Sequence, residues 1–375
     1  AAYSMSTLFS AMKPIVLTGF VKEQGLPDLW AGVLAATPFI GIASAALLGA
    51  KVAARQRFTA IVLVLGTLLA VSELATAALV ALPWAVFALQ FLAGLCVGLL
   101  MGVGSACITR TSVAPALFGL VDMTAVLLMS FMVAAVGLAM EQRGLPGAFQ
   151  LAAGVCAVLT VLALGFSRST PPAGDASAVE PSIHEPLTIS LRHLAVVLMG
   201  VLFVTASGLG FAYMFTLADR LGLDYAVAGE RIGVLLFLSA FACLAGGWCA
   251  ARFGPYRPLA VAYVVCAMGW VLATQADSIA AFLGGLVLGV FSLQFCFPVL
   301  LALASSLDAA GRWAAIATPV QTSGFAWAAI VAGWLVGLWQ LEAIGYACVL
   351  GMAGCLVLLR FSRPEAARSH PHALR

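Results

Sequence analysis

The sequence has few charged residues for its length. Asp, Glu, Lys and Arg make up 9% of its 375 residues, whereas about a quarter of an ordinary soluble domain is charged. Hydrophobic residues reach 63%, and the mean hydropathy is +1.10. This composition argues against a soluble globular protein and indicates that most side chains face lipid or one another. The formal net charge of +3 gives no support for nucleic-acid binding, so no nucleic-acid partner is expected.

Sequence patterns that carry chemistry are also scarce. The sequence contains no Walker loop, no HExxH or GxSxG motif and no CxxC pair, and its four histidines lie in segments expected to be cytoplasmic, in or beside the central loop and in the tail. These absences argue against ATP-driven transport by this chain alone and against a histidine proton relay in a membrane. We therefore expect no cofactor, no metal site and no enzymatic activity. The nine cysteines are expected to be small buried hydrophobes without disulfides.

Long apolar stretches with very short connections fill most of the chain instead. Because lipid cannot hydrogen-bond an open backbone, stretches of about 20 apolar residues without alternation must cross a bilayer as helices. The predicted fold is therefore an all-α integral membrane protein with twelve transmembrane helices in two six-helix pseudo-repeats. The predicted spans are 1–21, 29–51, 58–82, 84–108, 114–140, 147–167, 191–218, 226–251, 257–276, 279–305, 313–338 and 343–361.

The distribution of Lys and Arg predicts the orientation of the chain. With the N-terminus in the cytoplasm, thirteen of the eighteen Lys and Arg residues fall on that side and four on the other, and Lys13 lies within a span. Since cytoplasmic loops carry an excess of these residues, both termini are predicted to be cytoplasmic. The expected location is the lipid bilayer of a bacterial inner (plasma) membrane, and the expected state is a monomer.

A polar, proline-rich segment between the sixth and seventh spans indicates a linker. Short sequences recur on either side of it: Gly32-Val33-Leu34 opens the second span and Gly233-Val234-Leu235 opens the eighth. Such an internal repeat would let one half rock against the other. The predicted division is an N-terminal six-helix bundle (1–167), a cytoplasmic linker (168–190), a C-terminal six-helix bundle (191–362) and a cytoplasmic tail (363–375).

Basic turns follow the second and eighth spans. After the eighth span, Gly247, Arg252, Gly254 and Arg257 fit the pattern Gly-x3-Asp-Arg-x-Gly-Arg-Arg, with Ala251 where the acid belongs. With these turns, the 6+6 layout and the central loop, the sequence resembles the major facilitator superfamily over nearly its whole length. The copy after the second span is more degraded, and it contains Arg55.

The resemblance implies a transporter that works by alternating access, with spans 1, 4, 7 and 10 lining a central cavity. It places Arg55, Arg110 and Arg252 near a cytoplasmic gate, although the acid that helps latch this gate in the family is missing here. The fourth span begins Gln90-Phe91-Leu92-Ala93-Gly94, where the family usually has Arg in place of Gln90.

The first span has a polar stripe. At about 100° per residue, Tyr3, Ser6, Ser10 and Lys13 lie within about 80° of arc, on one face of a helix. A charge near mid-span costs roughly 3 kcal/mol unless it is paired or hydrated. Lys13 is therefore predicted to bind an anionic group of a substrate, with Tyr3, Ser6 and Ser10 beside it. The alternative is a structural ion pair with an acid on a neighbouring helix.

Two acids lie well inside spans. Asp122 in the fifth span is the natural partner for Lys13, and it could load a proton on one side of the membrane and release it on the other. Its alternative role is a static ion pair that closes the gate, for example with Arg110. Glu73 in the third span is a second candidate for proton coupling, with a hydrogen bond that pins two helices as the alternative.

The second half offers neutral polar and aromatic side chains rather than buried charges. Tyr213, Gln294, Gln321 and Trp327 are candidates to contact a substrate, although any one of them could instead make a hydrogen bond between helices. Charge in one half and neutral groups in the other suit an amphipathic organic solute with one acidic end.

These observations predict a secondary active transporter that moves a small organic solute, anionic or amphipathic, by proton-coupled alternating access. Its partners would be that small molecule, protons and the bilayer. The alternatives are a multidrug or lipid-like efflux transporter, a facilitator that uses no ion, or a non-transporting membrane sensor built on a transporter fold. An integral-membrane enzyme is a further alternative, although the sequence offers few groups that could serve as catalytic residues within the membrane.

Overall fold

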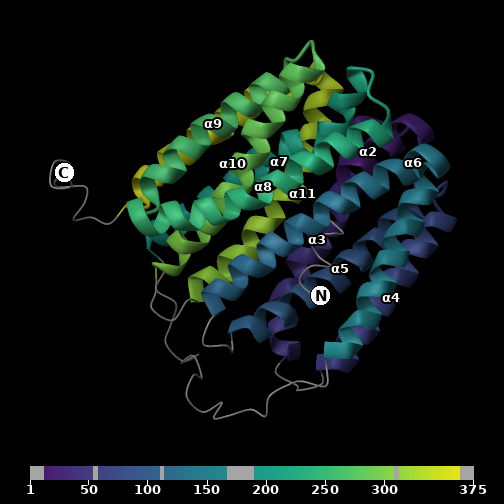
Figure 1. Ribbon diagram of the computed structural model, residues 1–375, viewed down its shortest axis with the longest axis horizontal. Coiled ribbons are helices and arrows are strands. Elements are labelled where there is room, and N and C mark those ends of the chain that lie inside the picture. Colours follow the sequence, from purple (N-terminus) through teal and green to yellow (C-terminus); the bar gives the residue numbers. More distant parts are fainter. Residues whose placement is uncertain (1–11, 54–57, 110–113, 167–189, 308–311, 364–375) are drawn as a thin grey trace.

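The computed structural model describes residues 12–53, 58–109, 114–166, 190–307 and 312–363 (Figure 1). Within these ranges the chain is helical and contains no β-strand. The helices are α2 (Lys13–Gln24), α3 (Asp28–Ala53), α4 (Phe58–Ala78), α5 (Pro83–Thr109), α6 (Ala114–Phe166), α7 (Leu191–Arg220), α8 (Tyr225–Phe253), α9 (Tyr256–Thr274), α10 (Ile279–Ser305), α11 (Arg312–Trp339) and α12 (Glu342–Phe361).

Helix α6 runs over 53 residues and contains two membrane-crossing segments. The two segments meet at Gly144, whose φ of 62° and ψ of −159° are not helical. A residue with a side chain would be strained at this φ, so glycine allows the reversal here. The turn Gly144-Leu145-Pro146 lies between the predicted fifth and sixth spans. Helix α2 contains the later part of the predicted first span. Because α6 supplies two of the predicted spans, the eleven labelled helices correspond to twelve, and the twelve-helix fold expected from the sequence is confirmed.

The outer surface of the bundle is apolar. Ten of the described helices are long and apolar enough to cross a membrane. Large hydrophobic side chains project outward, among them Val64 at 64% exposure and Leu350 at 74%. In water such a surface would aggregate, and in a bilayer it contacts acyl chains. Exposed Trp30 and Trp84, with ring centroids 6.5 Å apart, lie where α3 and α5 begin, and tryptophans at helix ends are typical of the aromatic belts at membrane interfaces.

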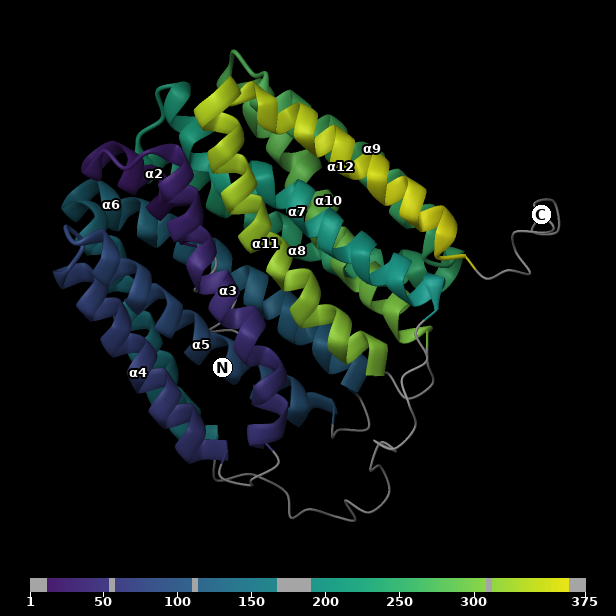
Figure 2. The same cartoon turned by 180° about the vertical axis from the view of Figure 1, so that it is seen from behind.

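Helices α2–α6, which we call the N-terminal half, lie to one side of the molecule, and α7–α12, the C-terminal half, to the other (Figures 1 and 2). The halves meet mainly where α3 packs on α11 and α6 packs on α8, with α2 against α7 between these pairs. We call the end of the bundle that carries the turn between α2 and α3 the α2–α3 end. The turn at Gly144 lies at the same end, because Glu23 of α2 accepts a hydrogen bond from the backbone N–H of Leu145.

The repeated glycines of the sequence occupy equivalent places in these contacts. A Cβ on Gly32 of α3 would lie 2.3 Å from the carbonyl oxygen of Ala329 in α11, and one on Gly233 of α8 would lie 2.8 Å from that of Ser130 in α6. Each glycine therefore allows its helix to approach the backbone of a helix in the opposite half. The repeat predicted from the sequence thus places the same small residue at both major contacts between the halves.

Candidate functional site

Lys13 is buried in the middle of the bundle. Its side chain is 5% exposed. It begins α2, eleven residues before the helix ends at Gln24, which is about 16 Å along the helix axis. That is about half the thickness of the hydrocarbon core of a bilayer. Lys13 therefore lies about half a bilayer's thickness from the end of α2, and its depth in the membrane stays a prediction.

A chain of hydrogen bonds connects Lys13 to two residues of α4. Lys13 Nζ donates to Oε1 of Gln90 in α5 at 2.5 Å. The Nε2 group of Gln90 in turn donates to Glu73 Oε1 and to Thr76 Oγ1, at 3.2 Å each. Thr76 can accept because its own hydroxyl donates to the carbonyl of Ser72, at 2.8 Å. The amide of Gln90 therefore presents its oxygen to the cation and its nitrogen to the carboxyl group.

Glu73 is the acidic member of this network. It is completely buried, and its Oε2 atom has no hydrogen-bond partner among the described residues. Lys13 and Glu73 interact electrostatically, and buried Cys156 of α6 lies close enough to interact with both. Isolated charges are costly in a bilayer, and this network brings together a basic group and an acidic group that can compensate each other.

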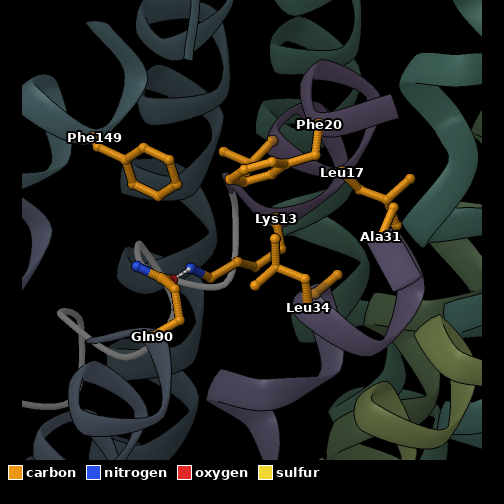
Figure 3. A pocket seen from close by; sticks show the side chains of 9 residues that line it. Lys13, Leu17, Phe20, Ala31, Leu34, Gln90 and Phe149 are labelled. Carbon is orange, nitrogen blue, oxygen red and sulfur yellow. Dashed lines mark hydrogen bonds between the residues drawn. The ribbon is translucent and has the colours of Figure 1, made fainter. Parts of the chain in front are cut away.

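Two small cavities flank Lys13, and both are lined almost entirely by apolar side chains. The first has about 250 Å³ of space between its atoms, and Gln90 and Lys13 are its polar side chains (Figure 3). Figure 3 shows Lys13 reaching toward Gln90 beneath the rings of Phe20 and Phe149. The remaining lining residues are Val16, Leu17, Ala31, Leu34 and Ala35.

The second cavity lies between the two halves. It has about 290 Å³ of space between its atoms, and Lys13 is its charged lining residue. Its other lining residues are Pro14, Leu17, Ala35 and Phe39 from the N-terminal half and Gly208, Phe211, Ala212, Phe325 and Ala329 from the C-terminal half. The centre of a water-sized molecule has only about 10 Å³ open to it in the first cavity and about 20 Å³ in the second, which is room for about one water molecule in each. Lys13 thus lies at the boundary between the halves, in a conformation that leaves little room for a solute.

Contacts between the halves close the α2–α3 end above this site. Lys22 of α2 forms an ion pair with Asp219 of α7 and lies 5.6 Å from the ring centroid of Tyr225 in α8. One turn deeper, the hydroxyls of Thr18 and Thr216 are hydrogen-bonded at 2.8 Å. The two halves are therefore joined by polar contacts that run from the end of the bundle toward Lys13.

The neutral residues expected to contact a substrate are spread over the C-terminal half. Tyr213 is buried, and its hydroxyl donates to the backbone carbonyl of Asp28 at 3.5 Å, a contact between the halves. Gln294 and Gln321 are also buried, and Gln321 packs against Gly200 of α7. None of these three lines either cavity. Trp327 is 57% exposed on the apolar outer surface, which does not support contact with a substrate.

The other predicted residues fall in three groups. Asp122 of α6, which the sequence suggested as the partner of Lys13, is half-buried and interacts with Cys243 of α8. The hydrogen bond that Lys13 donates goes to Gln90. Arg252 lies at the end of α8, with its guanidinium 5.7 Å from the ring of Trp248. The remaining candidates lie outside the described residues: Tyr3, Ser6, Ser10, Arg55 and Arg110.

The sequence had not placed two parts of this site. Gln90 stood out as a departure from the family pattern, but nothing in the sequence connected it to Lys13 or Glu73. The aromatic side chains Phe39, Phe211 and Phe325 were indistinguishable from ordinary core residues. A polar amide in an otherwise apolar span was the one signal that could have pointed to Gln90.

Comparisons with known proteins agree with the fold. The sequence matches the Major Facilitator Superfamily over residues 1–329. The fold is that of a membrane transporter, and the chain belongs to this superfamily.

Solved structures of transporters share the fold. The nucleoside transporter NupG aligns with a TM-score of 0.71 at 13% identity, covering 97% of this chain and 98% of that one. A D-xylose-proton symporter aligns with a TM-score of 0.69 at 16% identity, covering 96% and 95%. A bacterial homologue of the human lysosomal transporter Spinster, in an inward-facing and occupied conformation, aligns with a TM-score of 0.71 at 12% identity, covering 96% and 92%. A comparison with curated protein sequences finds no match.

Proposed function

We propose that this transporter moves a small organic anion together with a proton. The observation that carries the proposal is the position of Lys13, whose buried side chain borders two apolar cavities, one of them between the halves. A fixed cation in apolar surroundings attracts an anion strongly, because there is little water to screen the interaction. The anionic end of the solute would bind the ammonium group of Lys13, and its remaining part would occupy the cavities.

Charge balance supports the participation of a proton. Without solute, the charge of Lys13 is compensated by Glu73 through the amide of Gln90. When an anion binds Lys13, the buried site would hold one negative charge too many, at a cost of several kcal/mol. A proton on Glu73 restores neutrality, and the Oε2 atom without a partner can receive it. We therefore assign the coupling role to Glu73 ahead of Asp122, which interacts with Cys243 on α8.

Alternating access would couple these events across the membrane. Opening of the α2–α3 end requires the Lys22–Asp219 contact to separate, and its closure returns Lys13 to the arrangement described above. The Lys and Arg distribution further supports an orientation with both termini in the cytoplasm of a bacterial cell, in its inner membrane. A monomer would suffice, since one chain supplies both halves. Reporter fusions at Arg375 and at Gly222 test this orientation, because they should report opposite sides of the membrane.

The function is tested by binding and by proton movement. Purified protein should be stabilised against heat by small organic anions in a dose-dependent way, and not by their neutral amides or by cationic dyes. Lys13→Met should abolish this stabilisation, whereas Glu73→Gln should retain it. In liposomes loaded with a pH-sensitive dye, an inward anion gradient should acidify the interior faster with the wild type than with Glu73→Gln, whose rate should equal that of liposomes without protein.

Two outcomes would contradict the proposal. If cationic dyes stabilise the wild type and Lys13→Met equally, the multidrug-type alternative is favoured. If anions bind but the interior pH does not respond in the wild type, the chain is a facilitator without proton coupling.

A further inference from the structure

Three aromatic rings face one another beside Lys13 in the cavity between the halves. Phe39 of α3 and Phe325 of α11 are stacked, with centroids 5.4 Å apart and planes inclined by 28°. Phe211 of α7 is tilted against Phe325 at 6.2 Å. All three line the cavity that Lys13 also lines. The site thus combines one cation with a group of aromatic rings contributed by both halves.

From this combination we infer that the solute is a flat aromatic monocarboxylate. The inference rests on the proposed function and specifies its substrate. The carboxylate binds Lys13, and the ring lies against Phe39, Phe211 and Phe325. Aromatic rings prefer offset-stacked or edge-to-face neighbours, and such pairs contribute binding energy beyond the area that they bury.

The lining of the cavities argues against polyhydroxylated solutes. A sugar or nucleoside would bury many hydroxyl groups, and each buried hydroxyl needs a hydrogen-bond partner to avoid a desolvation cost. Among the residues that the structure describes, the two linings offer the polar side chains of Lys13 and Gln90, and Gln90 already donates to Glu73 and Thr76. The substrates named for the structural neighbours NupG and the D-xylose-proton symporter therefore do not suit this lining.

The lining also limits the solute to one negative charge. Within the described part of the chain, Lys13 is the one cationic side chain in either lining. A second carboxylate would be buried without a counter-charge, and an uncompensated charge in such a place is strongly unfavourable. The solute is therefore a monoanion.

The position of Phe325 is fixed by its neighbours. Gly208 of α7 lies so close that a Cβ there would be 3.2 Å from Cδ1 of Phe325 and 2.7 Å from Cβ of Ala328. Phe39 and Phe211 are 6% and 7% exposed, so both rings are confined as well. Confined rings lose little freedom on binding and favour a flat partner over a puckered one.

Binding of matched acids tests the inference. Benzoate and cyclohexanecarboxylate have the same number of carbons and one carboxylate each, but only benzoate is flat and aromatic. Their affinities for the purified full chain are measured by calorimetry, because benzoic acid crosses lipid bilayers unaided and would obscure flux. We expect benzoate to bind between about twofold and tenfold more tightly than the saturated acid. Benzamide, which lacks the charge, should not bind measurably.

Variants locate the effect. Phe325→Leu should remove the preference for benzoate while retaining cyclohexanecarboxylate binding. The matched control is Phe237→Leu, which changes an aromatic residue of α8 that is 39% exposed and pairs with Phe131 and Phe241. This control should keep the preference. The melting temperature of each variant without ligand shows that it has folded.

The outcomes separate this inference from the proposed function. Equal affinities for the two acids, unchanged in Phe325→Leu but lost in Lys13→Met, would overturn the aromatic specificity and leave anion transport in place. Binding of benzamide as tight as that of benzoate would overturn the role of the carboxylate. If no organic anion binds at all, the proposed function fails and this inference fails with it.

Discussion

Gly137 of α6 and Gly229 of α8 lie backbone against backbone across the two halves. A Cβ on Gly229 would lie 3.0 Å from Cα of Gly137, and one on Gly137 would lie 2.5 Å from the carbonyl oxygen of Tyr225. No side chain fits between these helices while the α2–α3 end is closed. Adding one methyl group at either glycine should therefore shift the equilibrium between the closed and the open form of the α2–α3 end.

We predict that Gly137→Ala opens the α2–α3 end. Overpacking costs about 1–3 kcal/mol, which corresponds to at least about a fivefold change in the ratio of closed to open molecules. Electron-spin distances between labels at Gln24 and Asp224, both exposed at this end, should lengthen. The matched control is Gly154→Ala in the same helix, because a Cβ at Gly154 meets no atom within 4 Å. Equal distances in the two variants would contradict the prediction.

The ion pair between Lys22 and Asp219 should affect the same equilibrium but not the stability of the fold. Both side chains are substantially exposed, at 45% and 36%, and exposed pairs contribute about 0–1 kcal/mol. Lys22→Ala should therefore lengthen the label distances with little change in melting temperature, and high salt should reproduce the effect in the wild type. Exchanging the two charges, with Lys22→Asp and Asp219→Lys together, should restore closure.

A second ion pair at the same end provides the control. Arg220 and Glu342 form a contact of the same kind, but both belong to the C-terminal half. Glu342→Gln should leave the label distances as they are in the wild type. A similar lengthening in this variant would mean that the exposed charges act on the whole end of the bundle rather than through the contact between the halves.

Gln90→Leu should destabilise the protein. It removes the group that bonds both Lys13 and Glu73, and each buried polar group left without a partner costs about 1–3 kcal/mol. The melting temperature in detergent should fall clearly, whereas Gln275→Leu, which changes an exposed glutamine, should have little effect. Combining Gln90→Leu with Lys13→Met and Glu73→Gln should recover much of the loss, because the charges are then removed together. No recovery would show that Gln90 acts through packing alone.

Trp327→Leu should leave binding of organic anions unchanged. Trp327 is 57% exposed on the outer surface, two residues along α11 from Phe325 in the cavity. Surface substitutions usually change stability by less than about 0.5 kcal/mol, so the melting temperature should also be retained. Loss of anion binding in this variant would restore the interpretation of Trp327 that the sequence alone suggested.

The sequence predicted the fold well because lipid leaves a chain few alternatives. An apolar stretch must be a helix there, and the Gly144-Leu145-Pro146 turn separates two spans for reasons visible in the residues themselves. Lys13 could be singled out for the same reason, since one charge in an apolar span must be compensated. Its depth in the membrane also follows from counting along the span.

The partners of Lys13 could not be predicted in this way. Which helices lie beside α2 depends on packing, and periodicity does not reveal it. The sequence suggested Asp122 because that acid lies deep in a span, whereas the hydrogen bond from Lys13 reaches Gln90 and continues to Glu73 on α4. The aromatic cavity was hidden for a related reason, because Phe39 and Phe325 meet only when the two halves close on each other.

The cavities beside Lys13 also bear on ion leakage. A transporter that alternates between conformations must not let hydronium or sodium ions pass through it and dissipate the membrane potential. Apolar walls that shed water, together with a fixed positive group, repel small cations from a passage. The described linings supply the apolar walls, and Lys13 lines both cavities whereas Glu73, which compensates its charge, lines neither. A small cation that entered would therefore meet the ammonium group of Lys13 first, so the residue proposed to attract the cargo would also oppose the leakage of cations.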